Sequence, residues 1–122
     1  SSSAFSQLDD PQSPLSVRII YFDYDSSEIR SDYRSAIEAH SLYLQQNPNT
    51  SITLEGHADE RGSREYNLAL GERRARTVKQ QMLLLGANSS QIRLVSYGEE
   101  RPASDGHGDA SWQQNRRVEI LY

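Results

Sequence analysis

The chain has 122 residues, no cysteine, a formal net charge of −4 and a pI near 5.3. Without cysteine there are no disulfides, no thiol catalysis and no cysteine-ligated zinc, and the acidic balance argues against general nucleic-acid binding, which needs a basic surface. No stretch approaches the roughly 18 consecutive apolar residues of a membrane-spanning helix, and the length predicts one domain.

Residues 1–16 predict a flexible tether ahead of a domain that covers residues 17–122. The segment holds six serines, two prolines and few large apolar side chains, a composition typical of linkers. It has neither the basic nor the apolar region of a signal peptide. We therefore expect any export signal of the natural protein to have been removed upstream of Ser1.

The first strand and the first helix are expected between residues 17 and 47. The run VRIIYF, residues 17–22, is apolar on both alternating faces, which predicts a strand that is central in a sheet or covered on two sides. Ser31 is a candidate N-cap, and the helix should end at Asn47-Pro48-Asn49. The helical spacing assigns its inward face to Tyr33, Ala36, Ile37, His40 and Leu44.

The rest of the chain predicts one more helix and three more strands. Residues 51–55, SITLE, alternate in polarity like a half-buried strand. A helix should begin near Ser63 and stop at Gly86, a candidate left-handed C-terminal cap, with strands following at residues 91–97 and 116–122 and a loop over 98–110 between them. The order β-α-β-α-β-β predicts an α/β (α+β) fold of two layers, with both helices on one face of a four-stranded sheet. The inward face of the second helix is predicted to consist of Asn67, Leu70, Gly71, Arg74, Ala75, Val78 and Met82.

Arg74 is the unusual member of that inward face. A guanidinium keeps its proton, and burying it without a partner is costly. Asp59, in the loop before the same helix, is the nearest candidate partner, so we expect an Asp59–Arg74 pair at the rim of the two layers. The pair has two interpretations that the sequence leaves open. It is a structural salt bridge, or it is a dipolar pocket whose two charges receive a zwitterionic ligand. Asn67, on the same face, either bonds the loop backbone or contacts that ligand.

Other functional classes have weaker support. His57, Asp59 and Glu60 resemble metal ligands, but a third ligand of suitable geometry is unsupported, since His40 and His107 lie elsewhere in the chain. No nucleophile or phosphate-loop motif occurs, so we expect neither a metal, a cofactor nor an enzymatic activity.

Two further features also favour structural explanations over functional ones. The arginines of residues 61–76 alternate with glutamates, which is typical of solvated helix faces rather than of a nucleic-acid site. Trp112 is interpreted as an anchor at the edge of the core rather than as a platform for glycan stacking.

Five motifs together resemble one known family. They are GHADERG at residues 56–62, NLALGERRA at 67–75, YFDYDSSEI at 21–29, SYGEERP at 96–102 and NRRVEI at 115–120. On these motifs residues 17–122 are identified as a member of the OmpA-like peptidoglycan-binding family. The GHADERG form, with EYN and YFDYD, is most similar to the lipoprotein members, whereas flagellar stators and porin-linked anchors are looser matches. The resemblance implies the OmpA C-terminal-like sandwich with a mixed sheet.

The resemblance also implies a function, which is noncovalent binding of the peptide stem of peptidoglycan. In the family, the residues at the positions of Asp59 and Arg74 hold the ammonium and the carboxylate of meso-diaminopimelate. Those at Asn67 and Leu70 line the pocket, and the turn at Phe22-Asp23 offers backbone groups to the peptide. The implied role is to tether the outer membrane to the cell wall from the periplasmic face of that membrane. Since the chain has no cysteine, we expect any lipid anchor to lie in a segment upstream of it.

The resemblance implies a protein partner as well. Lipoprotein members bind the periplasmic propeller protein TolB through a surface that overlaps the peptidoglycan site, so the two partners should compete. The rim that would suit TolB consists of Tyr24, Glu60, Arg61, Arg64 and Glu65, although a solvated surface is the simpler explanation for each. Two alternatives remain: an anchor domain of another envelope protein, and a module that acts mainly through TolB.

Overall fold

The computed structural model describes residues 8–122, so residues 1–7 of the predicted tether lie outside the described part of the chain. The helices are α2 (Arg34–Gln46), α3 (Arg64–Leu84) and α4 (Asp109–Asn115), and short 3₁₀ turns occur at η1 (Pro14–Ser16), η2 (Ser31–Tyr33) and η3 (Ser89–Gln91). The strands are β1 (Ile19–Tyr21), β2 (Ile52–His57), β3 (Ile92–Gly98) and β4 (Arg117–Leu121).

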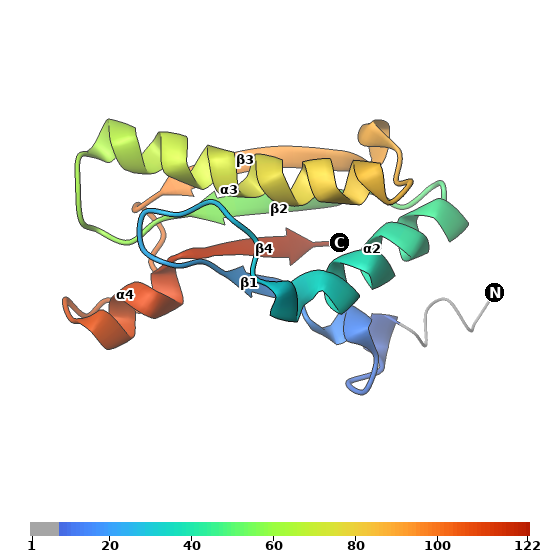
Figure 1. Ribbon diagram of the computed structural model, residues 1–122, viewed down its shortest axis with the longest axis horizontal. Coiled ribbons are helices and arrows are strands. Elements are labelled where there is room, and N and C mark those ends of the chain that lie inside the picture. The colour runs from blue at the N-terminus through green and yellow to red at the C-terminus, as the bar shows by residue number, and fades with distance from the viewer. Residues whose placement is uncertain (1–7) are drawn as a thin grey trace.

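The four strands form one mixed sheet in the order β1-β4-β2-β3. β2 and β3 are parallel, with Leu54 opposite Leu94, whereas β4 runs antiparallel to both β2 and β1, with Ile120 opposite Leu54 and Val118 opposite Ile20. Figure 1 shows α2 and α3 side by side on one face of this sheet. The predicted two-layer fold is confirmed, and the four strands and two long helices follow the predicted order, with one additional short helix, α4, between β3 and β4.

The core lies between the helices and the sheet. Along β2 the side chains of Ile52 and Leu54 are buried and those of Thr53 and Glu55 are partly exposed, as the alternation in SITLE predicts. All seven residues that the spacing assigns to the inward face of α3 are buried. Five of them are apolar or small and pack in the core, which leaves Asn67 and, above all, the charged Arg74 as exceptions that need an explanation.

A glycine pair lets α3 approach β2 more closely than side chains would allow. A Cβ atom on Gly56 would lie 1.8 Å from the carbonyl oxygen of Gly71, and one on Gly71 would lie 2.5 Å from Oγ of Ser96. Both distances are below van der Waals contact, so only glycine fits at these positions. This contact places the part of α3 that follows Gly71, including Arg74, over the end of β2.

The ends of α3 follow the sequence signals, whereas the start of α2 does not. Oγ of Ser63 accepts a hydrogen bond from the backbone N–H of Tyr66 at 3.1 Å, and Gly86 has a φ of +107°, as an N-cap and a left-handed C-terminal residue should. The prediction that Ser31 caps α2 is wrong. Ser31 begins the 3₁₀ turn η2, and Tyr33, which precedes α2, makes no side-chain cap.

Two other expectations need correction. The strand predicted at residues 17–22 is shorter and lies at the edge of the sheet rather than at its centre, and Ile19 is 38% exposed there. The run is apolar on both faces although only one face is covered by helices. The second correction concerns residues 109–115, which form the short helix α4 instead of continuing the loop.

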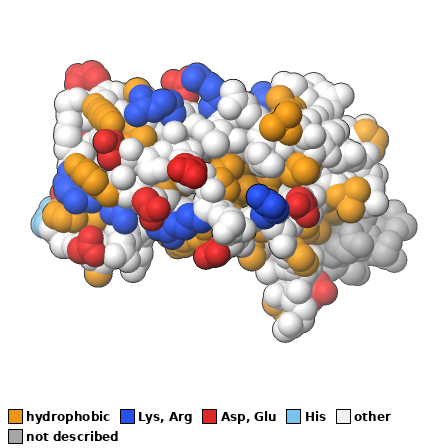
Figure 2. All heavy atoms as spheres, viewed as in Figure 1, with side chains coloured by type: hydrophobic (Ala, Val, Ile, Leu, Met, Phe, Trp, Pro, Cys, Tyr) orange, Lys and Arg blue, Asp and Glu red, His pale blue; other side chains and the backbone are white. Residues whose placement is uncertain are grey.

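The described part of the N-terminal segment is packed rather than free. Leu15, within η1, is 5% exposed and lies against α2. The backbone N–H of Leu15 donates a hydrogen bond to Oγ of Ser13. Ordered structure therefore begins before the predicted boundary at Val17. None of the helices within residues 8–122 combines the length and the apolar character needed to cross a membrane. Figure 2 shows acidic and basic side chains interspersed over the visible face of these residues.

Candidate ligand-binding site at the end of strand β2

Charged side chains from three parts of the chain lie near one another beyond the end of β2, and a loop from a fourth part covers them. Asp59 follows this strand, Arg74 comes from α3, and Arg116 immediately precedes β4. The loop of residues 22–30 that follows β1 passes over the same end of the sheet, between α3 and α4 in Figure 1. The arrangement is held by the helix–sheet contact and by the β4 pairing, so the side chains rest on rigid elements.

Arg74 is completely buried, with an exposed fraction of 0%. Its Nε donates to the carbonyl of Ser26 at 2.8 Å, Nη1 to that of His57 at 2.9 Å and Nη2 to that of Asp23 at 3.1 Å. A guanidinium has five N–H donors, so two remain beyond these three bonds. Within residues 8–122 no carboxylate lies within 4.0 Å of this side chain. Arg74 is therefore a buried cation held by neutral groups alone.

The electrostatics of Arg74 agree with this geometry. Burial lowers the pKa of Arg74 to about 10, and the positive charge of Arg116 acts in the same direction, while the negative charge of Asp59 opposes both. The side chain still carries its charge at neutral pH. A buried cation of this kind favours the arrival of an anion, because the desolvation cost is already part of the fold.

Asp59 is also buried, with an exposed fraction of 4%. Its Oδ1 accepts from the backbone N–H of Arg61 at 2.9 Å and from Nε of Arg61 at 3.2 Å, and its Oδ2 accepts from Nη2 of Arg61 at 2.8 Å and from Nη1 of Arg116 at 3.4 Å. Burial alone would raise the pKa of Asp59, but the hydrogen bonds from Arg61 outweigh burial and hold this pKa below its usual value.

The predicted Asp59–Arg74 ion pair is therefore wrong as a direct contact. Asp59 instead folds back on Arg61, two positions later, and accepts hydrogen bonds from its backbone N–H and from its guanidinium. Arg74 is closed off by carbonyl groups of the loop after β1. The two charges are close enough to affect one another's environment, yet each has its own set of partners.

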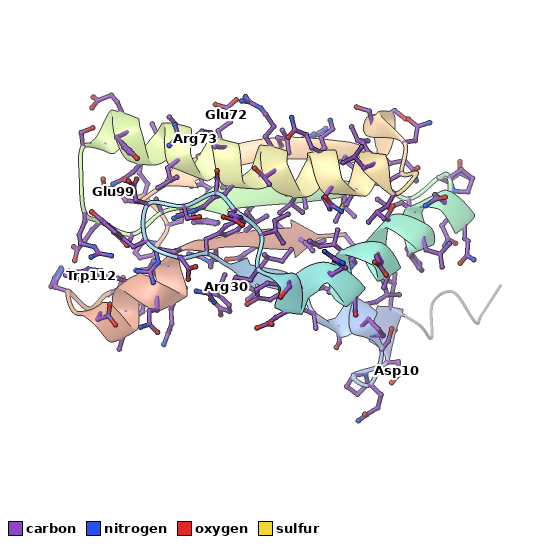
Figure 3. The ribbon with its side chains drawn as sticks, in the orientation of Figure 1. Asp10, Arg30, Glu72, Arg73, Glu99 and Trp112 are labelled. Atoms are coloured by element: carbon purple, nitrogen blue, oxygen red, sulfur yellow. The ribbon has the colours of Figure 1, made fainter. Side chains whose placement is uncertain are left out.

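The other predicted pocket residues are buried around these charges. Leu70 is 6% exposed and Asn67 is 2% exposed. Nδ2 of Asn67 donates to the carboxylate of Glu99 at 2.9 Å rather than to the loop backbone, and Figure 3 places Glu99 beside the first turns of α3. Phe22 is fully buried under Arg74, whose Cζ lies 5.4 Å from the ring centroid.

The turn at Phe22-Asp23 is occupied by protein contacts. The N–H of Phe22 donates to the carbonyl of Arg116, and Nε of Arg116 donates back to the carbonyl of Phe22, both at 2.9 Å. The Asp23 carboxylate pairs with Arg30, and the Asp23 carbonyl accepts from Arg74. In this conformation the backbone of the turn is bonded to both Arg74 and Arg116 and so links these two side chains.

Part of the predicted rim forms a stack of two rings around a guanidinium. Cζ of Arg61 lies 3.9 Å from the centroid of the Tyr24 ring and 4.1 Å from that of the Trp112 ring. Nε1 of Trp112 donates to Glu60 at 2.9 Å, and Glu60 also contacts Nδ1 of His107 at 2.8 Å. Trp112, labelled on α4 in Figure 3, thus anchors α4 to the loop after β2 instead of lying in the core.

The remaining rim residues are more exposed. Arg64 pairs with Glu100 across the surface, and Glu65 is exposed in the first turn of α3. Both lie on the same helix turn that begins at Ser63, next to the Asn67–Glu99 bond. The rim is therefore continuous with the buried charges rather than a separate surface.

The histidines do not meet at this site. His57 is buried and both ring nitrogens lack a hydrogen-bond partner, although Nε2 lies 3.6 Å from Glu55. Burial lowers its pKa to about 4, with Arg117 acting in the same direction. His40 bonds to the carbonyl of Val17 at 2.8 Å. Residues 8–122 contain no group of three or more acidic, histidine or cysteine side chains that could hold a metal ion.

Sequence reasoning missed the part that Arg116 and Glu99 play. Arg116 is only 7% exposed and contacts both Asp59 and Phe22. A possible signal was the double arginine that opens the last strand, where an apolar residue is usual at an inward position. Glu99 gave no such signal, because a glutamate in a loop is ordinarily solvated.

The comparisons with known proteins agree with this fold. The OmpA family matches residues 21–116. The chain is 46% identical over 113 residues to the peptidoglycan-associated lipoprotein of Pseudomonas aeruginosa, covering 93% of this chain and 67% of that protein. It is 50% identical over 105 residues to the lipoprotein of the same name from Legionella pneumophila, covering 86% and 60% respectively. The chain thus spans about two thirds or less of these relatives.

Solved structures match over a larger share. The crystal structure of the peptidoglycan-associated lipoprotein from Burkholderia pseudomallei superposes with a TM-score of 0.93 at 45% identity, covering 95% of this chain and 98% of that one. The C-terminal domain of Helicobacter pylori MotB gives 0.77 at 25% identity, covering 86% and 83%. The family match spans most of the chain and includes both Asp59 and Arg74, and the chain belongs to the OmpA family.

Proposed function

We propose that the domain binds the stem peptide of peptidoglycan noncovalently, through the zwitterionic centre of meso-diaminopimelate. The observation that carries this proposal is the buried guanidinium of Arg74, which has two N–H donors to spare and no carboxylate partner within residues 8–122. A ligand carboxylate would complete its charge balance. Reaching Arg74 requires the loop carbonyl of Asp23 or Ser26 to yield its place.

Asp59 is the proposed receptor for the ligand ammonium. Its carboxylate is buried beside the end of β2 and stays ionised, since its pKa is held low. An ammonium and a carboxylate on one carbon atom need an acceptor and a donor close together, and Asp59 and Arg74 are of the right types. Asn67 and Leu70 are proposed to line the pocket, and Phe22 and Asp23 to position the peptide through the turn after β1.

The role of the whole protein is part of the proposal. The relatives are named peptidoglycan-associated lipoproteins and are longer than this chain. By analogy, the domain would tether the outer membrane to the cell wall from its periplasmic face, as a member of the Tol-Pal system, with a lipid anchor in a segment beyond this chain. The recognition would be noncatalytic, because binding alone serves a tether. The OmpA family also includes anchor domains of other envelope proteins, and that assignment remains the nearest alternative.

A second candidate is action mainly through the periplasmic partner TolB. The exposed rim favours it, because Tyr24 is 59% exposed and its ring stacks on Arg61. The same rim includes Glu60, which binds Trp112, and the surface pair formed by Arg64 with Glu100. Aromatic and arginine side chains are enriched at protein interfaces. Since Arg61 contacts both Tyr24 and Asp59, TolB and the peptide would compete for one surface.

The proposal is tested by calorimetric titration with a muropeptide that contains meso-diaminopimelate, against the same peptide with lysine in its place. Binding of the first alone is expected, because lysine lacks the carboxylate that Arg74 would hold. Binding of neither by a folded domain contradicts the proposal, and titration with TolB would then test the second candidate. Equal binding of both peptides would remove Arg74 from the site.

Two substitutions test the residues themselves. Asp59→Ala and Arg74→Ala should each lose about 2–5 kcal/mol of binding free energy, because each leaves one ligand charge without its partner. Glu72→Ala, at an exposed position on α3, is the control and should bind like the parent. If either variant remains folded and binds normally, the assignment of that residue is wrong. If either one unfolds, its role is structural.

A further inference from the structure

The guanidinium of Arg61 is bound to the carboxylate of Asp59, which is also the proposed partner of the ligand ammonium. Two of its guanidinium nitrogens contact the two oxygens of Asp59, at 3.2 and 2.8 Å. A side-on contact of this kind fills the directions from which another cation would approach. In this structure, therefore, a group of the protein stands where the ammonium of the ligand would bind.

The position of the Arg61 side chain is fixed by contacts with two aromatic rings. Its guanidinium lies between the rings of Tyr24 and Trp112, 3.9 and 4.1 Å from their centroids, and cations are attracted to such ring faces. Trp112 is held in turn by the bond from its Nε1 to Glu60. The two rings come from the loop after β1 and from α4, so two segments distant in the sequence hold one half-buried side chain in place.

Arg61 can leave this place at little cost to the fold. The Arg61 side chain is 30% exposed. The side chain of Arg116, the second cation that contacts Asp59, is only 8% exposed and also donates to the carbonyl of Phe22. When Arg61 leaves, its guanidinium is hydrated, and Arg116 stays beside the carboxylate. An incoming ammonium replaces one positive charge by another, so the charge balance around Asp59 does not change.

We propose that Arg61 is a built-in competitor that occupies Asp59 in the ligand-free domain and is displaced when the ammonium of the ligand binds. This inference rests on the proposed function. Arg61 then sets the affinity of the site: the binding-competent form is the fraction of molecules in which Arg61 has released Asp59. The ring pair of Tyr24 and Trp112 stabilises the closed form.

The experiment is calorimetric titration of the meso-diaminopimelate muropeptide into the parent domain and into Arg61→Gln. We expect the substitution to lower the Kd about tenfold, as it should if Arg61 holds Asp59 for about nine-tenths of the time. Arg76→Gln is the matched control. It makes the same change in net charge at an exposed arginine that pairs with Glu72 on α3, and it should leave the Kd unchanged. A Kd that is unchanged or higher in Arg61→Gln overturns the inference.

Two further measurements keep the test decisive. Trp112→Leu leaves Arg61 and Asp59 in place but removes one ring face, and should lower the Kd by a smaller factor. In NMR spectra, the Nε–H signal of Arg61 should exchange faster with water when the muropeptide is bound, while that of Arg116 should not change. An unchanged Arg61 signal at saturation also overturns the inference. If the folded parent and Arg61→Gln both fail to bind, the proposed function itself has failed.

Discussion

The two ends of the sheet bury polar side chains in different ways. At the start of β2 and β3, Nε2 of Gln91 lies within hydrogen-bond distance of the carbonyls of Leu44, Asn47 and Thr50, at 2.9, 3.0 and 2.7 Å. At the opposite end, Arg74 also bonds three backbone carbonyls. The number of partners is the same, but Gln91 is neutral and Arg74 is charged.

This difference separates a structural side chain from a candidate binding group. Gln91 has its amide donors satisfied and no charge left to balance, so its bonds join the end of α2 to the start of β3 and do nothing more. Arg74 has its three bonds and still lacks an anion. Counting hydrogen bonds alone would class both residues as structural, whereas counting charges as well identifies the end of the sheet at which a ligand is expected.

The largest expected effect concerns the contact that brings Arg74 over β2. Gly56→Ala would place a Cβ atom 1.8 Å from the carbonyl oxygen of Gly71, so α3 must move away from the sheet. We expect a loss of at least about 3 kcal/mol in the free energy of unfolding, measured by chemical denaturation. Gly108→Ala is the matched control, because nothing lies within 4 Å of the added atom. Similar stability of the two variants would show that the close approach is unimportant.

The next prediction compares the two ends of the sheet directly, through one substitution at Gln91 and one at Arg74. Gln91→Leu should lower the free energy of unfolding by about 2–3 kcal/mol, because buried carbonyls lose their donor, while the affinity for the muropeptide stays the same. Arg74→Met should lose that affinity. Gln80→Leu, exposed on α3, controls for the change of side chain. If Gln91→Leu weakens binding as much as Arg74→Met does, the two ends are not distinct.

The dependence of stability on pH tests the burial of His57, which lies at the same end of the sheet as Arg74. The pKa of His57 is lowered from 6.5 to about 4, so between these values the unfolded chain binds a proton that the folded domain excludes. The contribution of His57 to the free energy of unfolding is therefore fully present well above pH 6.5, and it is lost as the pH falls from there toward 4. Between pH 7 and pH 5 the loss from His57 should be about 2 kcal/mol. Burial also lowers the pKa of His40, which adds to the loss with the same sign.

The contribution of His57 is isolated by comparing unfolding curves of the parent with those of His57→Phe. The variant should show a weaker dependence on pH across this range. An equal slope for His57→Phe and the parent would mean that the buried ring titrates normally.

The smallest effect is expected at the helix start that leads into the charged end. Ser63→Ala removes the hydrogen bond from the N–H of Tyr66 and should cost about 1 kcal/mol of unfolding free energy. Ser35→Ala, at an exposed position inside α2, should change stability little. A loss of affinity in Ser63→Ala beyond this small destabilisation would show that the cap also positions Asn67.

The fold was largely predictable, because periodicity and caps are local properties of the sequence. The spacing of the inward residues on α3 and the left-handed Gly86 both follow from the identity of nearby residues. The short helix α4 was missed because it has only seven residues and follows a segment rich in glycine and aspartate. The edge position of β1 was missed because strand order depends on contacts between distant segments.

The positions of Asp59 and Arg74 were predictable, whereas their contacts and the parts played by Arg116 and Glu99 were not. Asp59 and Arg74 are both buried near the end of β2, yet Asp59 accepts its hydrogen bonds from Arg61 and Arg116. Sequence separation could not distinguish these partners, because a loop residue can reach both Arg61 and Arg74. The choice depends on the loop after β1, whose carbonyls bind Arg74, and that loop is distant in the sequence.

The order of strands has a consequence for how the domain is made. β4 is the last strand in the chain, yet it lies between β1 and β2 and joins them. Until residues 117–121 leave the ribosome, β1 has no neighbour in the sheet, and β2 can pair only with β3. Non-local pairing of this kind delays folding. The complete sheet can therefore form only after residues 117–121 have been synthesised, and until then the domain remains accessible to chaperones.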